Sequence, residues 1–116
     1  MSMERMLDTL VSLGLTRTEA QVYIFLAKKG PHREKELANA LKLTKQQFHS
    51  SLKNLIAKGI VNATRERTTR YSAVSLAKVL DNFTKTKMEQ AKAFQANKEE
   101  LLTSWQSIIK KEHNNQ

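Results

Sequence analysis

Apolar residues recur at intervals of three and four along most of the first 58 positions, which is the spacing of amphipathic helices. Thr16 and Glu19 have the separation of a capping box, and Gly30 followed by Pro31 marks the end of the helix that they begin. Thr44 is a suitable N-cap for a later helix, which Gly59 ends. The pattern therefore predicts four helices, at about residues 3–13, 16–29, 33–42 and 44–58.

The period changes after Gly59. Residues 60–64 and 70–74 are short β-prone runs, and the polar residues 65–69 between them have the length of a hairpin connection. From Ser75 onward there is neither Pro nor Gly, so we expect one long helix to about Lys111. The expected fold is mainly α with a small β-hairpin (α+β). It consists of a winged helix-turn-helix domain at residues 1–75 and a long C-terminal helix at residues 76–116, whose roles the following patterns indicate.

The predicted helix 44–58 has two chemically different faces. At 100° per residue, one face carries the apolar side chains of Phe48, Leu52, Leu55 and Ile56. The opposite face has no carboxylate and presents Gln46, Ser50, Lys53, Asn54 and Ala57. An α-helix fits the major groove of DNA, where amide and hydroxyl groups can distinguish base pairs. This helix is therefore the candidate recognition helix.

Positive charge is concentrated in the same part of the chain. Twenty Lys and Arg residues against eleven Asp and Glu residues give a net charge of +9. Residues 44–80 contain seven of the basic residues and a single acidic residue, Glu66, so this segment alone carries +6. Charge by itself is equally typical of a polyanion-binding surface and of an ordinary basic surface. Together with the order of the helices and the wing, it favours nucleic-acid binding.

Residue types within this segment suggest separate roles in DNA binding. Gln46 and Gln47 can pair with adenine edges, and Ser50 can adapt to several bases. Thr44 and the lysines suit phosphate contacts, and the wing arginines suit the backbone or an adjacent minor groove. We expect His49 to be a flanking phosphate contact or a surface residue, and not a metal ligand. The predicted DNA-binding set is Thr44, Lys45, Gln46, Gln47, His49, Ser50, Lys53, Arg65, Arg67 and Arg70.

Several short motifs follow one another along residues 7–80. They are Leu13-Gly14-Leu15-Thr16 with Glu19-Ala20, Val22-Tyr23, Leu26 and Gly30-Pro31; Glu36-Leu37-Ala38; Leu52-Lys53-Asn54-Leu55 with Lys58-Gly59-Ile60-Val61; and Arg70-Tyr71-Ser72-Ala73-Val74. In order and spacing this run resembles the N-terminal domain of archaeal TrmB-type transcription regulators, which implies a DNA-binding winged helix. The chain departs from the family's usual pattern at Lys42, where Gly is common, and at Thr44, where many members have Pro. It does not continue into the sugar-binding domain of longer members, so we expect no small-molecule effector.

The last predicted helix carries an apolar seam with alternating spacings of three and four, which is typical of a coiled coil. The seam is Met88, Ala91, Gln95, Lys98, Leu102, Trp105 and Ile109, and Phe94, Leu101 and Ile108 widen it. We predict that two copies of the chain form a homodimer through this seam, and that all of these residues except Gln95 lie in the interface. The two recognition helices would then lie roughly 34 Å apart on one duplex. The alternative is a helix that folds back on its own domain.

The remaining composition argues against other classes of protein. Without cysteine there is no disulfide, thiolate metal site or thiol nucleophile. No segment approaches the roughly 20 apolar residues of a membrane span, and no catalytic constellation or glycine-rich phosphate loop is present. We expect a cytoplasmic, non-enzymatic transcription regulator without metal or cofactor, whose partners are double-stranded DNA and a second copy of itself. Two alternatives stay open: a non-specific architectural or chromatin DNA-binding protein, and a protein-interaction winged helix of the transcription machinery.

Overall fold

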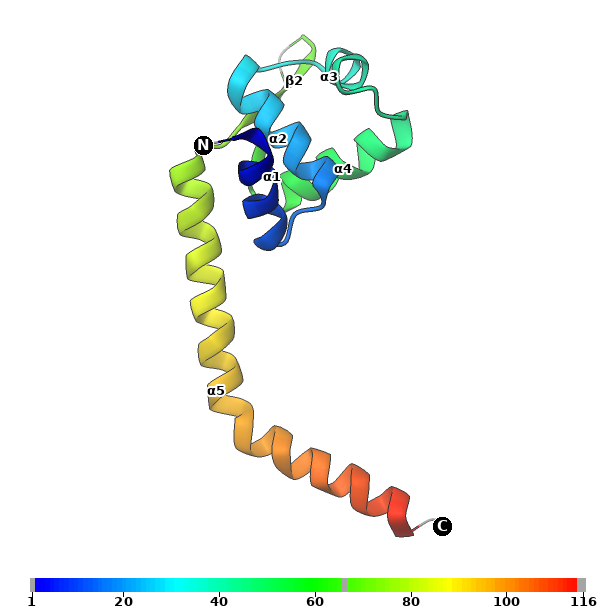
Figure 1. Cartoon of the computed structure of the whole chain (residues 1–116), viewed down its shortest axis with the longest axis vertical. Helices are drawn as coiled ribbons and strands as arrows, with labels where there is room; N and C mark the ends of the chain where they lie inside the picture. Colours follow the sequence, from blue (N-terminus) through cyan, green and yellow to red (C-terminus); the bar gives the residue numbers. More distant parts are fainter. Residues whose placement is uncertain (1, 66, 115–116) are drawn as a thin grey trace. The chain divides into compact units, whose positions relative to one another are not determined.

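The computed structural model describes residues 2–65 and 67–114 (Figure 1). Its helices and strands, in chain order, are α1 (Met3–Ser12), α2 (Arg17–Lys29), α3 (Glu34–Leu41), α4 (Lys45–Ala57), β1 (Val61–Arg65), β2 (Thr69–Ala73) and α5 (Leu76–Asn114). The chain forms two compact units, Met1–Leu80 and Asp81–Gln116. The predicted fold class is confirmed: this is a winged helix-turn-helix followed by a long helix.

Side-chain caps explain where the helices begin. Thr16 Oγ1 accepts a hydrogen bond from the Glu19 amide, and Glu19 Oε1 accepts one from the Thr16 amide at 2.8 Å, so the predicted capping box is present. Ser2 caps α1 in a similar way. At the other end of α2, Gly30 has a φ of 84°, a conformation that side chains other than glycine rarely adopt. These local interactions fix the helix boundaries close to the predicted ones.

The core of the first unit forms around α2, which packs against α1, α3, α4 and β2. From α2 it receives the buried side chains of Val22 and Leu26, and from α3 it receives Leu37. Phe48 and Leu55 of α4 are both fully buried against this centre. Burying a side chain of this size contributes about 1.5–3 kcal/mol. The apolar face of α4 is therefore firmly anchored, which fixes the direction of its opposite face.

One expectation about this face is wrong. Ile56 was expected on the apolar face, but 40% of it is exposed, whereas Ser51 is buried and its hydroxyl donates to the Gln47 carbonyl at 2.9 Å. The buried face is centred between Phe48 and Leu55, and Ile56 lies about 90° around the helix from that centre. The serine hydroxyl is satisfied within the helix, so a small polar residue can take the buried position.

The wing is the antiparallel pair of β1 and β2, in which Val61 is paired with Ala73 and Arg65 with Thr69. Each strand lies within one residue of its predicted place. A third segment joins this sheet: the amide of His32 donates to the Tyr71 carbonyl, and the Tyr71 amide donates to the His32 carbonyl at 2.8 Å. The segment between α2 and α3 thus ties the wing to the helical core, a contact that the sequence analysis did not predict.

Helix α5 continues to Asn114, three residues beyond the predicted end. In the first unit its residue Val79 is buried. From Asp81 onward the helix belongs to the second unit, in which Phe83 is half-buried and the large apolar side chains from Met88 to Ile109 are exposed. None of the helices in the described part of the chain is long and apolar enough to cross a membrane.

Candidate nucleic-acid interface

Helix α4 begins at a reciprocal cap. Thr44 Oγ1 accepts from the Gln47 amide at 3.2 Å, and Gln47 Oε1 accepts from the Thr44 amide at the same distance. The carbonyl oxygen of the Gln47 side chain is therefore used within the helix, which leaves its NH₂ group as the donor that faces outward. The sequence already contained this signal, because Thr44 and Gln47 have capping-box spacing.

The polar face of α4 is open. Gln46, Ser50 and Lys53 are exposed, as are Lys45 and Asn54. Among the described residues, no side-chain hydrogen bond or ion pair engages Lys45, Gln46 or Lys53. The buried Phe48, Leu52 and Leu55 hold the other side of the helix. The helix thus presents amide, hydroxyl and ammonium groups in one direction and has no carboxylate of its own on that face.

A carboxylate from the preceding helix lies at the edge of this face. The Oε1 atom of Glu34 in α3 is 3.2 Å from Nδ1 of His49, whose side chain is 72% exposed. The sequence predicted His49 to be a flanking phosphate contact or a surface residue and gave no sign of this pair, because the two residues are 15 positions apart and no periodicity links them.

The corner between α3 and α4 contains an unusual backbone conformation. Lys42 has φ 54° and ψ 43°, in the left-handed region, and among the described non-glycine residues it alone has a positive φ. The Leu43 amide donates to the Ala38 carbonyl at 3.2 Å and closes the end of α3. This is the position at which the family pattern has Gly, and the conformation explains that preference because glycine adopts it without strain.

The wing carries the arginines. Arg65 and Arg70 lie near the ends of β1 and β2, and Arg67 lies in the connection between the strands; all three are exposed. Arg67 and Arg70 line an open groove of about 620 Å³ together with Pro31, Thr64 and Thr68. Glu66, the single acid of residues 44–80, lies outside the described residues.

Tyr71 holds the wing against the helices. It exchanges two backbone hydrogen bonds with His32, as described above, and its side chain is half-buried. Burial raises the pKa of the Tyr71 phenol, the nearby charge of Glu34 raises it further, and Arg65 opposes the change. The phenol is therefore neutral at physiological pH and adds no negative charge beside the wing.

A partly buried ion pair fixes the far end of α4. Glu19 is 1% exposed, and its Oε1 atom accepts from the Thr16 amide and lies 3.4 Å from Nζ of Lys58. Lys58 Nζ is also 3.5 Å from the Gly14 carbonyl oxygen. Lys58 is consequently an anchor between α4 and α2, in contrast to the freely exposed Lys53. Within the described residues, no group of three or more His, Asp or Glu side chains could hold a metal ion.

Comparisons with known proteins agree on the type of fold. Residues 10–77 match the sequence model of a family described as sugar-specific transcriptional regulator TrmB. A search of curated proteins found no match.

Among solved structures, TrmBL2, an archaeal chromatin protein, is 31% identical with a TM-score of 0.76, over 88% of this chain and 41% of TrmBL2. The ST1889 protein of the thermoacidophilic archaeon Sulfolobus tokodaii is 30% identical with a TM-score of 0.63, over 78% of this chain and 98% of that protein. A point mutant of Lactococcus lactis ZitR in complex with DNA is 19% identical with a TM-score of 0.50, over 87% of this chain and 77% of ZitR, and shows the fold alone. The chain thus spans about two fifths of TrmBL2.

Proposed function

Because the chain belongs to the TrmB family of winged-helix DNA-binding transcription regulators, we propose that it binds double-stranded DNA as a homodimer. In this proposal α4 enters the major groove, and the wing at residues 65–70 contacts the backbone or the adjacent minor groove. Regulation of transcription is the consequence of this binding. The protein acts without catalysis, metal or cofactor, and in the cytoplasm.

The open polar face of α4 is the observation that carries the proposal. Gln46 and Ser50 project from the first two turns, where a recognition helix contacts base edges. Lys45 and Lys53 add positive charge without an internal partner among the described residues. Gln46 is the stronger candidate for adenine readout, because the carbonyl oxygen of Gln47 is engaged with the Thr44 amide. Gln47 then contributes only a donor.

The remaining predicted contacts position the protein on the duplex. Thr44 and Lys45, at the start of α4, suit phosphate oxygens, because helix N-termini favour anions. His49, on the exposed side of α4, adds a flanking phosphate contact through a ring N–H. Arg65, Arg67 and Arg70 extend the cationic surface along the wing. Each phosphate that the protein neutralises adds about 0.9 to the slope of log K against log salt concentration.

The apolar surface of α5 supports the homodimer. In the second unit, Phe94 is 63%, Leu101 53% and Trp105 56% exposed. Such a stripe on one helix is costly in water, and a second copy of the same helix would cover it through coiled-coil packing. The proposed interface comprises Met88, Ala91, Phe94, Lys98, Leu101, Leu102, Trp105, Ile108 and Ile109.

A second function, non-specific chromatin binding, is favoured by the similarity to the chromatin protein TrmBL2. The two functions differ in base readout. Selection of bound sequences from random duplexes, followed by affinity measurements at one salt concentration, separates them. The regulator proposal predicts that the selected site binds at least about 10³-fold more tightly than random duplex. A ratio near one would instead support chromatin binding, and binding to neither duplex would contradict both.

Replacement of Gln46 tests base readout directly. We expect Gln46→Ala to lower affinity for the selected site while leaving affinity for random duplex unchanged, because a bidentate base contact is worth about 1–3 kcal/mol of discrimination. Gln106→Ala is the matched control, since Gln106 is an exposed glutamine in α5. An equal loss on both duplexes would show that Gln46 does not read bases.

A further inference from the structure

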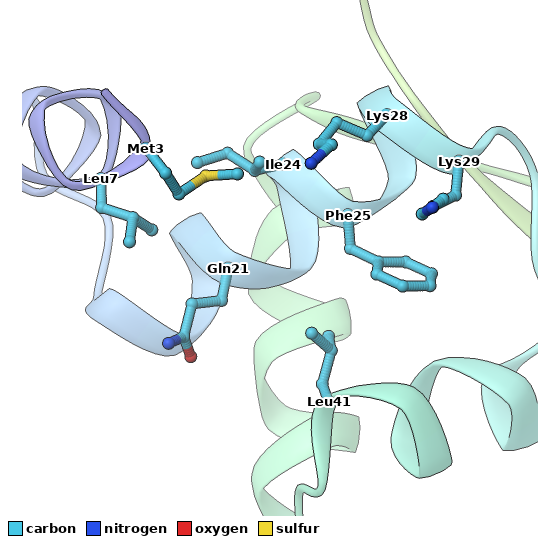
Figure 2. A pocket seen from close by; sticks show the side chains of 8 residues that line it. All are labelled: Met3, Leu7, Gln21, Ile24, Phe25, Lys28, Lys29 and Leu41. Carbon is cyan, nitrogen blue, oxygen red and sulfur yellow. The ribbon is translucent and has the colours of Figure 1, made fainter. Parts of the chain in front are cut away.

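An apolar pocket lies in the first unit and is lined by none of the residues to which we assign DNA contacts. Met3 and Leu7 of α1, Ile24 and Phe25 of α2, and Leu41 at the end of α3 surround it. Figure 2 shows these side chains around one space between the three helices. The pocket volume is about 260 Å³. An engineered cavity of about 150 Å³ already holds benzene, so this space suits a ligand somewhat larger than one ring.

The lining leaves apolar surface accessible to solvent. Leu7 is buried, whereas Ile24, Phe25 and Leu41 are half-buried and Met3 is 46% exposed. Covering these side chains would be favourable because apolar surface would leave water. The ligand must therefore have an apolar body.

Positive charge stands at one side of the same pocket. Lys28 and Lys29, in the last turn of α2, are exposed lining residues, and Figure 2 shows Lys29 on the side of Phe25 and Lys28 on the side of Ile24. Within the described residues, neither lysine has a hydrogen-bonding or ionic side-chain partner. The two positive charges of these lysines outweigh the negative partial charge, roughly half an elementary charge, at the C-terminus of α2. Charge complementarity thus favours an anionic group on the ligand.

We propose that this pocket binds small organic acids that have an apolar body of about ten non-hydrogen atoms and one carboxylate. The apolar body contacts Ile24, Phe25 and Leu41, and the carboxylate lies near the two lysine ammonium groups. Ligands of this size bind with a Kd on the order of 10⁻⁴ to 10⁻³ M.

The pocket adjoins two parts of the molecule that hold α4 and the wing. Leu41 is the last residue of α3 and precedes Lys42, which has the left-handed conformation. The Phe25 ring meets the His32 ring edge-on, with centroids 5.2 Å apart, and His32 pairs with Tyr71 of the wing. A ligand that moves Leu41 or Phe25 should therefore change the chemical environment of the Lys42 and His32 amides.

Two-dimensional ¹H–¹⁵N NMR of the full chain tests the proposal, with 3-phenylpropanoate as the probe. We expect saturable shifts of the Ile24, Phe25 and Leu41 amides, accompanied by shifts at Lys42 and His32. The matched ligand 3-phenylpropan-1-amine has the same ring and chain with the opposite charge, and we expect it to bind at least tenfold more weakly. Equal binding of the two ligands, or no saturable shift with 10 mM 3-phenylpropanoate, would overturn the proposal.

Protein variants separate the pocket from general surface charge. We expect Lys28→Gln combined with Lys29→Gln to weaken 3-phenylpropanoate binding at least fivefold, because both anion partners are lost. Both side chains are exposed, so the fold is expected to be retained. Lys35→Gln, on an exposed lysine of α3 that does not line the pocket, should leave binding unchanged. A similar loss in Lys35→Gln would overturn the proposal. If the amide chemical shifts of the pocket residues change with protein concentration and not with added probe, a second copy of the chain covers the pocket. That result would also overturn the proposal.

Discussion

Lys42 shows how a single residue can limit the stability of the helix-turn-helix corner. Its left-handed backbone places Cβ close to the following carbonyl oxygen, which costs roughly 1–2 kcal/mol for a residue other than glycine. The fold nevertheless keeps this conformation, because the corner must turn from α3 into α4 within Lys42, Leu43 and Thr44. The strain therefore lies directly before α4, the proposed recognition helix.

Replacing Lys42 with glycine should relieve this strain. We expect Lys42→Gly to raise the free energy of unfolding by about 0.5–1 kcal/mol, after the larger loss of chain entropy by glycine is subtracted. Urea unfolding measures the change. Ala40→Gly is the control, since Ala40 is an exposed helical residue of α3 and the substitution should destabilise by about 1 kcal/mol. A loss of stability in Lys42→Gly equal to that in Ala40→Gly would show that the position carries no strain.

The cap of α3 should depend on pH. The Arg33 amide donates to Glu36 Oε1 at 3.0 Å, and this bond, followed by the Arg33 guanidinium, lowers the pKa of the Glu36 carboxyl in the folded state. Its stabilisation is therefore present above the pKa of the unfolded chain and is lost as pH falls through the folded value. We expect Glu36→Gln to be less stable than the wild type at pH 7 and equally stable at pH 3, in urea unfolding at both pH values. A constant difference would contradict this explanation.

At the scale of elements, α4 is held at both ends and along one face. Thr44 and Gln47 cap its N-terminus, and Lys58 joins its C-terminus to Glu19. Phe48 anchors its buried face in the core. A helix fixed in this way presents its polar face in one orientation, which lowers the conformational entropy lost on binding. In the proposed complex, base readout by α4 would therefore depend on contacts on the side of the helix that packs against the core.

Removing the cation from this anchor tests its importance. We expect Lys58→Met to lower the free energy of unfolding by about 1–3 kcal/mol, because the buried Glu19 carboxylate loses a charged partner. Because Lys58 is half-exposed, the loss of stability should be smaller than for a fully buried ion pair. Lys53→Met removes an equivalent charge from the exposed face and should change stability by less than about 0.5 kcal/mol. Equal effects of the two substitutions in urea unfolding would contradict the anchoring role.

Local patterns predicted the elements well because caps and turns act over a few residues. Thr16 with Glu19, Thr44, and Gly59 placed helix boundaries within one or two positions. Contacts between distant parts of the chain escaped prediction. The pairing of His32 with Tyr71 and the approach of Glu34 to His49 join residues far apart in sequence, and no period records them. The exposure of Ile56 was missed for a different reason, because the true centre of the buried face depends on what packs against it.

At the scale of the whole molecule, the proposed dimer determines how two recognition helices act together. The second unit carries a stripe of exposed apolar side chains along α5, including Met88, Leu102 and Ile109. Pairing of these stripes would double the number of phosphate contacts, and therefore the salt dependence of binding. Affinity for DNA and self-association are consequently linked.

A charge within the stripe should separate the two copies. We expect Leu102→Glu to elute as a monomer in size-exclusion chromatography with light scattering, because two buried carboxylates would oppose pairing. Ser107→Glu places the same charge on the opposite side of the helix and should leave the dimer intact. If Leu102→Glu and the wild type have the same mass in solution, α5 does not form the interface through this stripe.

The salt dependence of duplex binding by Lys53→Ala tests the central claim most directly. The account predicts that wild-type affinity, measured by fluorescence anisotropy, falls steeply with salt and that Lys53→Ala reduces the slope of log K by up to about 1.8 per dimer. Lys110→Ala, an exposed lysine of α5, should keep the wild-type slope. Identical slopes for Lys53→Ala and the wild type, or wild-type binding that does not respond to salt, would contradict the assignment of α4 to the DNA interface.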